Sequence, residues 1–336
     1  MNHSYRAYGL TFSSDNPVPG LYPETNNRVP DIIVEVAPSP PLWVQQGRTL
    51  PSCIHRGKAG IIEAMDPSCK LTTFGAWEFF ELAYADGTRF VIDGAGARLW
   101  GTCSAPLTIE DLAVYLRGPV AGFLLQRRGI SAFHASAVCL GEHAVVVCGH
   151  SESGKSTTAA AFALRGIPIL CDDIAAVAAH EELFYVEPAY PRICLWPDAV
   201  RALFGAPDAL PRLTPTWEKR FLPLDGAMAA FEARRRPVAV IYILAERSEE
   251  EAPLIEEVTP REALLELVRN TYMNWLLDRK QRIAEFDLLS KLVTQVPVRR
   301  IVPHVDPARI GALCELVTGD AERLIARRES AVTSDR

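Results

Sequence analysis

Residues 149–157 read Gly149-His150-Ser151-Glu152-Ser153-Gly154-Lys155-Ser156-Thr157 and match the pattern G-x-x-x-x-G-K-[ST] without a mismatch. Glycine lets the backbone of such a loop wrap closely around an anion, so that successive N–H groups point at phosphate oxygens. Lys155 is then expected to reach the β- and γ-phosphates, and the hydroxyl of Ser156 to contact a magnesium ion. The stretch predicts a phosphate-binding loop, formed by all nine residues, for a nucleoside triphosphate.

The segments on either side of this loop support the prediction. Residues 143–148, His-Ala-Val-Val-Val-Cys, form a short apolar run typical of a buried strand. Residues 157–165 are rich in helix-forming residues, and Gly166 follows them as a stop signal. The order strand, loop, helix places a phosphate at the partly positive N-terminus of a helix. A Gly/Ser-rich surface turn is the alternative, but it does not account for both flanking elements.

A second apolar strand, residues 167–171, ends in the paired carboxylates Asp172 and Asp173. An aspartate that ends a strand near a phosphate loop commonly holds magnesium, directly or through water. The other carboxylate of such a pair can accept a proton from an attacking hydroxyl group. The alternative is an ordinary acidic turn after a strand.

The run from Phe133 to Val177, F-H-A-S-A-V…G-H-S-E-S-G-K-S-T…R-G-I-P-I-L-C-D-D-I-A-A-V, resembles the catalytic domain of the HPr serine kinase/phosphorylase family. The resemblance implies an α/β fold with a P-loop catalytic domain that uses ATP and Mg2+. It also implies that Asp172 is the general base and that Asp173, with Ser156, binds magnesium. His134 would lie beside the base, although an isolated histidine can equally be a hydrogen-bonded core residue.

The chain departs from that family at several positions. Glu152 stands where the family loop usually has its middle glycine, and His150 is also unusual. The family's later Glu-Ile-Arg-Gly-x-Gly segment is replaced here by residues 187–198 and 218–224. The family's phosphorylase activity depends on this region. The replacement segments contain P-R-I-C-L-W-P-D and E-K-R, which are similar to motifs of a bacterial side branch. Some members of that branch phosphorylate the C-terminal serine of lasso-peptide precursors, which implies a peptide or small protein with an acceptor serine as partner. Family resemblance also implies a homo-oligomer.

Three cations in the replacement segments are candidates for the catalytic site. Arg192, Lys219 and Arg220 could neutralise the charge that spreads over the γ-phosphate during transfer. The alternative for each is a solvated surface charge.

Composition excludes several classes of protein. The chain has 336 residues, 49% of them hydrophobic, and a formal net charge of −6 without a basic face or tail, which argues against nucleic acid as a partner. None of its eight cysteines forms a C-x-x-C pair, which argues against a zinc site or a disulfide framework. The N-terminus lacks a signal-peptide core, and no apolar run of about 18 residues predicts a membrane helix. These features predict a cytoplasmic protein with no membrane association. The basic cluster 234–236 is expected to be a solvated turn.

The chain is expected to divide into three parts. A small α+β domain that grips a substrate or forms an interface is predicted for residues 1–125. The HPr kinase-like P-loop catalytic domain is predicted for residues 126–326, and a polar, frayed tail for residues 327–336. Strands are predicted at 31–36, 79–83, 89–92, 144–148, 167–171 and 238–244, and helices at 108–117, 155–165, 198–204, 260–278 and 285–296.

Four functions fit these observations. The favoured one is an ATP- and magnesium-dependent serine kinase that acts on a peptide or small protein, a lasso-peptide precursor above all. The alternatives are an HPr kinase/phosphorylase-type regulator, a P-loop switch that hydrolyses nucleotide, and a binding module in which ATP only stabilises the fold.

Overall fold

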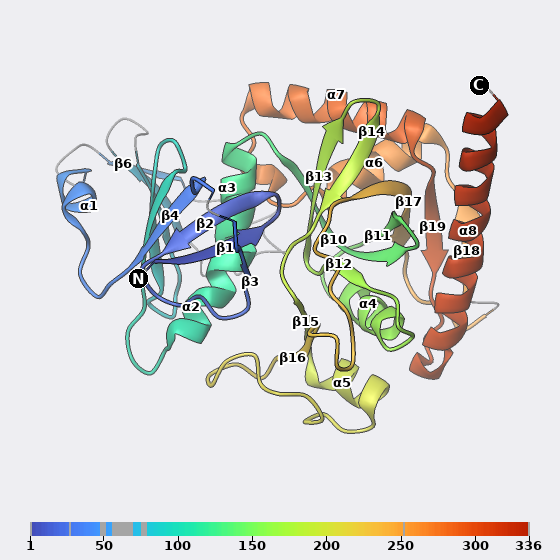
Figure 1. The fold of residues 1–336 in the computed structure, drawn as a ribbon, viewed down its shortest axis with the longest axis horizontal. Helices are drawn as coiled ribbons and strands as arrows, with labels where there is room; N and C mark the ends of the chain where they lie inside the picture. Colours follow the sequence, from blue (N-terminus) through green and yellow to red (C-terminus); the bar gives the residue numbers. More distant parts are fainter. Residues whose placement is uncertain are drawn as a thin grey trace. The chain divides into compact units, whose positions relative to one another are not determined.

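The computed structural model describes residues 2–26, 28–47, 52–55, 70–74, 79–250 and 253–334. They form two compact units (Figure 1). Unit 1 comprises Met1–Gly129 together with Leu213–Trp217, and unit 2 comprises Ile130–Arg212 and Glu218–Arg336. The first division lies close to the predicted boundary at residue 125. The return of residues 213–217 to unit 1 differs from the prediction, which placed them in the catalytic domain.

Unit 1 is an α+β structure built on one nine-stranded sheet. The strand order is β3-β1-β2-β4-β9-β8-β7-β6-β5. The strands are β1(His3–Ala7), β2(Leu10–Ser14), β3(Tyr22–Pro23), β4(Ile32–Val36), β5(Ser52–His55), β6(Lys70–Phe74), β7(Phe79–Ala83), β8(Arg89–Asp93) and β9(Arg98–Thr102). The helices are α1(Leu42–Gly47), α2(Ile109–Tyr115) and α3(Ala121–Arg127), with a π-helical turn at Leu116–Val120 between α2 and α3. Its core contains the fully buried side chains of Phe90, Ile92, Leu99, Leu112 and Leu124.

The helix predicted at 108–117 begins where the sequence placed it and ends early. The Asp111 carboxylate accepts hydrogen bonds from the Thr108 backbone N–H (2.8 Å) and from its hydroxyl (2.9 Å), so the predicted N-terminal cap is present. The regular helix stops at Tyr115 because Gly118 has non-helical dihedral angles and Pro119 follows it.

Unit 2 contains an eight-stranded sheet whose strands β11, β10, β13, β14 and β17 pair in a closed circuit. The long strand β10(Ser131–Leu140) makes the circuit possible, because its first half pairs with β13 and its second half with β11 and β12. The other strands are β11(His143–Cys148), β12(Ile169–Cys171), β13(Ile174–His180), β14(Leu183–Glu187), β17(Arg236–Leu244), β18(Leu254–Glu257) and β19(Val298–Val302). A separate hairpin pairs β15(Arg192–Leu195) with β16(Arg220–Pro223).

Helices cover this sheet and close the core of unit 2. They are α4(Lys155–Ala163), α5(Pro197–Phe204), α6(Pro260–Asn270), α7(Arg279–Gln295) and α8(Ile310–Ser334). Helix α4 packs against α8, β10 and β15, and α6 packs against β10, β19 and α7 (Figure 1). Alternate residues of β11, Val145 and Val147, share the core with Phe162 of α4 and Val317 of α8. This packing fixes the loop between β11 and α4.

Two predicted helices near the C-terminus are present but with different bounds. The helix predicted at 260–278 ends at Asn270, because Thr271 is extended and Met273 is left-handed. Helix α7 begins at Arg279, earlier than predicted, because the Asp278 side chain accepts a hydrogen bond from the Gln281 backbone N–H (2.8 Å) and caps it.

The predicted polar tail is also helical, since α8 continues to Ser334, and Asp335 and Arg336 lie outside the described residues. Arg328 ties this end of the helix to the sheet by donating to the Val238 carbonyl (3.0 Å).

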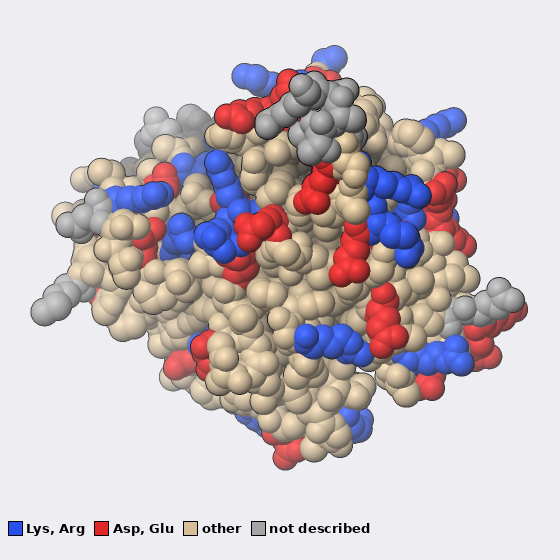
Figure 2. All heavy atoms as spheres, turned by 45° about the vertical axis from the view of Figure 1, so that its right-hand side comes forward, with Lys and Arg blue, Asp and Glu red and all other residues tan. Residues whose placement is uncertain are grey.

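The basic cluster 234–236 is not wholly a solvated turn. Arg236 is buried and paired with Glu232 and Glu142, whereas Arg234 is exposed. Figure 2 shows basic and acidic side chains intermixed on the face that it presents. Among the described helices, none is both long and apolar enough to span a bilayer. Six cysteines are free thiols, and the side chains of Cys53 and Cys69 lie outside the described residues.

Candidate functional site

The phosphate-loop motif lies between β11 and α4, in the arrangement that the sequence predicts. Lys155, at the start of α4, is only 5% exposed, and its Nζ donates to the carbonyls of Gly149 (2.8 Å) and His150 (2.6 Å). Burial lowers the pKa of Lys155, and the carboxylates of Asp173 and Asp172 partly oppose that shift. The lysine therefore ties the start of α4 to the first two residues of the loop, within reach of the charges of the paired aspartates.

Glu152 sits in the loop with a left-handed backbone, φ +64°. An L-residue is strained there because its Cβ approaches the neighbouring carbonyl oxygen, whereas glycine is not. This explains why a glycine at this position suits such a loop. The Glu152 side chain is exposed, so the loop carries an additional negative charge at its surface.

Asp172 follows β12 and is the buried member of the pair, with 1% exposure. Its Oδ1 accepts a hydrogen bond from Ser136 Oγ (2.7 Å), and its Oδ2 accepts one from the Cys194 backbone N–H (3.0 Å). Burial and the adjacent charge of Asp173 raise the pKa of Asp172, while hydrogen bonds from Ser136, Cys194 and Ser156 act in the opposite direction. Asp172 therefore lies against Ser156, the predicted magnesium ligand.

Asp173 is the open member of the pair. Its side chain is 44% exposed, its φ is +71°, and its Oδ1 accepts a hydrogen bond from His134 Nε2 (3.1 Å). Burial raises the pKa of Asp173, but the hydrogen bond and charge of His134 and the charges of Lys219 and Lys155 outweigh it and lower the pKa to about 2. The left-handed backbone at Asp173 is strained for an L-residue, a feature that clusters at active sites. His134 contacts Asp173 rather than Asp172, the residue beside which the family resemblance places it.

The structure separates the three candidate cations. Lys219 lies with its Nζ 4.8 Å from the Trp196 ring, and its charge acts on both Asp173 and Lys155. Arg192 stacks over the Phe221 ring at 4.2 Å. It occupies the face of the β15–β16 hairpin that also carries Cys194.

Arg220 lies on the opposite face of this hairpin. It pairs with Leu195, whose side chain is buried, and it donates to the Leu210 carbonyl (3.5 Å). Of the three predicted cations, Lys219 is the one whose charge acts on Asp173, whereas Arg192 packs on Phe221 and Arg220 shares a hairpin face with the buried Leu195.

Three residues at or near this site were not predicted. Ser136 is two positions beyond His134 on β10, so the two-residue period of a strand could have placed both side chains on one face. Tyr272 reaches the site through a backbone hydrogen bond to the Ala132 carbonyl (2.7 Å), and its ring lies edge-on to His134 at 6.0 Å. Arg247 follows β17, and its Nη2 lies 3.4 Å from the point where a Cβ on Gly154 would stand. No sequence signal links Tyr272 or Arg247 to the loop.

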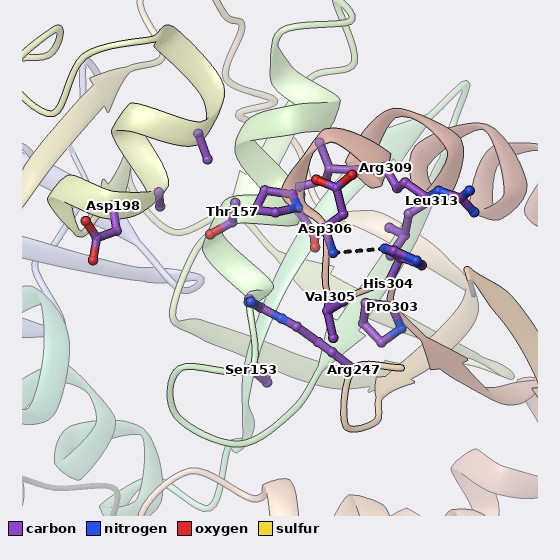
Figure 3. A pocket seen from close by; sticks show the side chains of 16 residues that line it. Ser153, Thr157, Asp198, Arg247, Pro303, His304, Val305, Asp306, Arg309 and Leu313 are labelled. Atoms are coloured by element: carbon purple, nitrogen blue, oxygen red, sulfur yellow. Dashed lines mark hydrogen bonds between the residues drawn. The ribbon is translucent and has the colours of Figure 1, made fainter. Parts of the chain in front are cut away.

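A cavity of about 210 Å³ opens beside the loop (Figure 3). Its walls come from the end of the loop and the first turn of α4, from α5, from Arg247, and from residues 303–313. In Figure 3 the side chain of Arg247 extends beside the start of α4. The cavity and the loop share Ser153 and Gly154.

The donor set around the aspartates suits magnesium when a nucleotide supplies further ligands. Among the described residues, no group of three or more His, Cys, Asp or Glu side chains could hold a metal ion on its own. Magnesium keeps several waters and typically needs one or two carboxylates together with substrate phosphates. A serine hydroxyl at Ser156 in contact with the Asp172 carboxylate fits that requirement.

Comparisons with known proteins leave the family open. A scan against protein-family models gives no match, and a search of curated proteins gives none either. Among solved structures, the chain is similar to the HPr(Ser) kinase/phosphatase from Coxiella burnetii, with a TM-score of 0.35 and 12% sequence identity. The match covers 61% of this chain and 99% of that protein. A likeness at this level carries no argument about function.

Proposed function

We propose that the protein is an ATP- and magnesium-dependent phosphotransferase that phosphorylates a serine of a peptide or small protein. The observation that carries the proposal is the pairing of a lysine-closed phosphate loop with two adjacent carboxylates in different environments. The buried carboxylate contacts Ser156 of the loop, and the open one binds His134. A loop that only stabilised the fold would not require this second, open carboxylate.

The proposed reaction is an in-line transfer. The acceptor serine oxygen forms a bond to the γ-phosphorus, the bond from that phosphorus to the β,γ-bridging oxygen breaks, and ADP leaves. Asp173 accepts the serine proton, because a base must reach the hydroxyl and Asp173 is the exposed carboxylate of the pair. Its low pKa keeps it ionised at neutral pH, and His134 orients it.

Asp172 takes the other role in this proposal. Its contact with Ser156 suits it to hold the magnesium side of the site, and Ser136 and the Cys194 N–H fix its orientation. Asp172 and Ser156 would hold Mg2+, which would supply positive charge to neutralise the charge that develops during transfer. Lys155 and Lys219 add positive charge around the transferring group. The two aspartates thus exchange the roles that the family resemblance implies.

The proposed acceptor is the C-terminal serine of a lasso-type precursor peptide. Support for this acceptor comes from the P-R-I-C-L-W-P-D and E-K-R motifs at residues 191–198 and 218–220. The runner-up acceptor is HPr, which the resemblance of residues 133–177 supports.

Intact-mass spectrometry tests the proposal. The protein, ATP and Mg2+ are incubated separately with a lasso-type precursor that ends in serine and with HPr. A phosphate-sized gain on the peptide that maps to its last serine supports the proposal, and a gain on HPr alone assigns the protein to the regulator class. ATP consumption with neither acceptor modified replaces the proposal with a nucleotide-hydrolysing switch.

Two variants test the assignment of roles. Asp173→Asn is expected to lower the transfer rate by about 100-fold or more at saturating magnesium, because a general base contributes about that much. Asp172→Asn is expected to lower transfer by orders of magnitude as well, but with a higher magnesium concentration for half-maximal rate. Asp287→Asn, an exposed aspartate on α7, is the matched control and should leave both quantities unchanged. A normal magnesium requirement in Asp172→Asn would return the base role to that residue.

A further inference from the structure

We propose that Tyr272 is a positioning residue of the transfer reaction. Its ring holds His134 against Asp173, and through His134 it fixes the carboxylate that accepts the serine proton. The inference rests on the proposed function, in which Asp173 is the base. It adds to the site a residue from the connection between α6 and α7, which is remote in sequence from the phosphate loop.

The backbone around Tyr272 is held against β10. Thr271 pairs with Phe133 in an antiparallel bridge, and the Tyr272 N–H donates to the Ala132 carbonyl (2.7 Å). His134 is the next residue of the same strand. Two backbone contacts therefore bring Tyr272 to the part of β10 that carries His134.

The chain adopts a strained conformation to make this pairing. Helix α6 ends at Asn270, whose buried side chain donates to the Glu266 carbonyl (2.9 Å). Met273, directly after Tyr272, has a left-handed backbone, φ +55°, and a buried side chain. Such strain persists only where the surrounding structure imposes it. The turn therefore fixes the direction in which the Tyr272 ring leaves the backbone.

His134 is held by two different contacts. Its Nε2 lies 3.1 Å from Asp173 Oδ1. The Tyr272 ring lies edge-on to the imidazole, with the ring centroids 6.0 Å apart and an angle of 74° between the planes. Aromatic rings prefer this edge-to-face arrangement over a face-to-face one. A hydrogen bond and a ring contact thus set the orientation of the imidazole together.

The orientation of His134 decides where Asp173 presents its free oxygen. Among the described residues, the hydrogen bond to the Asp173 side chain is made at Oδ1, so Oδ2 remains for the acceptor hydroxyl. If the imidazole turned away, the carboxylate could rotate and move Oδ2 out of line with the acceptor, which slows transfer. Burial raises the pKa of Tyr272, and the charge of Asp173 raises it further, so the phenol stays neutral beside the base.

Rate measurements on a double-mutant cycle test the inference. Transfer from ATP, at saturating ATP and Mg2+, is followed by intact mass on whichever acceptor the unmodified protein modifies, the precursor peptide or HPr. Tyr272→Leu removes the ring, Tyr272→Phe removes only the hydroxyl, and His134→Ala is made alone and together with Tyr272→Leu. Tyr185→Leu is the matched control, because the partly buried Tyr185 ring also lies edge-on to a histidine, His180, at 6.0 Å.

The expected results separate a positioning role from a structural one. Tyr272→Leu should lower kcat by about three- to tenfold, because an edge-on contact favours one orientation by about that factor. Its affinity for ATP, measured by calorimetry, should not change. Tyr272→Phe and Tyr185→Leu should both retain the kcat of the unmodified protein. His134→Ala should lower kcat at least as much as Tyr272→Leu, and the double variant should be no slower than His134→Ala alone, because both changes remove the same contact.

Several outcomes would overturn the inference and leave the proposed function standing. Losses that multiply in the double variant would show that Tyr272 does not act through His134. An unchanged kcat in Tyr272→Leu, or a loss in Tyr272→Phe as large as in Tyr272→Leu, would also contradict a role for the ring. Tyr272→Met takes the place of Tyr272→Leu in the cycle if thermal unfolding shows that the leucine variant is not folded at the assay temperature. Absence of transfer by the unmodified protein to either acceptor overturns the proposed function and the inference with it.

Discussion

Replacing Glu152 by glycine should make the protein both more stable and better at binding ATP. The left-handed backbone at this residue, φ +64°, costs an L-residue about 1–2 kcal/mol. Glycine avoids that cost but loses about 0.4–1 kcal/mol, because it has more freedom in the unfolded chain. Glu152→Gly is therefore expected to raise the free energy of unfolding by about 1 kcal/mol, which shifts the midpoint of thermal unfolding by about 2–4 °C for a unit of this size.

Removal of the Glu152 carboxylate should also tighten nucleotide binding. Two unit charges about 8 Å apart in a water-like medium interact by about 0.5 kcal/mol before screening by salt. Because a triphosphate carries more than one negative charge, the repulsion amounts to about 0.5–1 kcal/mol. The dissociation constant for ATP should therefore fall by about two- to fivefold, and by less at high salt.

Glu152→Ala separates the backbone effect from the charge effect. It removes the carboxylate but keeps a side chain with a Cβ, so it should bind ATP as tightly as Glu152→Gly without the gain in stability. Calorimetry measures the binding, and thermal unfolding followed by circular dichroism measures the stability. If the alanine variant unfolds at the same temperature as the glycine variant, or higher, the strain argument is refuted. If neither variant binds ATP more tightly than the unmodified protein at low salt, the carboxylate does not act on the nucleotide.

Two further predictions concern buried polar contacts. Lys155→Ala should weaken ATP binding and abolish transfer, because it removes the cation and leaves the carbonyls of Gly149 and His150 without their donor. Calorimetry measures the affinity for ATP, and an unchanged affinity would show that the loop does not bind phosphate. Tyr242→Phe removes one hydrogen bond to the buried Asp320 carboxylate (2.8 Å) and should lower the free energy of unfolding by about 1.5–3 kcal/mol. Asp320→Asn also leaves Arg299 without its buried partner and should cost more, about 3–5 kcal/mol; denaturant titration that ranks the two variants in the opposite order would contradict this account.

The parts of the site that are continuous in sequence could be predicted. Local composition and two glycines at fixed spacing predict three elements: the strand before Gly149, the helix that starts at Lys155 and the strand that ends before Asp172. These signals are local, so tertiary packing does not override them. The different environments of Asp172 and Asp173 could not be predicted, because burial of one and exposure of the other depend on Ser136 and Cys194 from other strands.

The helix prediction at 260–278 shows how a local signal can mislead. The sequence continues with helix-compatible residues past Asn270, but the backbone turns at Thr271 to bring Tyr272 beside β10. The capping pair Asp278 and Gln281 marks the start of the next helix and could have been recognised as such.

Residues brought to the site by long-range pairing gave no signal in the sequence. Arg247 reaches the phosphate loop because β17 lies parallel to β11 and both strands end at the same edge of the sheet. Arg192 and Arg220 could be assigned to alternate faces of their strands from the two-residue period. Which of the two faces is buried depends on how the β15–β16 hairpin packs, and no local sequence signal reports that packing.

The assignment of residues 213–217 to unit 1 affects how the two units can be expressed separately. Thr216 Oγ1 donates to Asp111, and the Trp217 ring lies edge-on to Tyr115 at 5.8 Å, so the segment is anchored well inside unit 1. Neither unit is a single uninterrupted stretch of chain, and one cut near residue 130 leaves unit 1 without residues 213–217 and unit 2 with them as an insertion. A fragment that starts at residue 130 would contain residues 213–217 without the rest of unit 1. The side chain of Leu213, which is buried in the whole protein, would then be exposed to water. Expression of unit 2 on its own therefore calls for a short polar turn in place of residues 213–217, whereas unit 1 on its own needs that segment to be supplied.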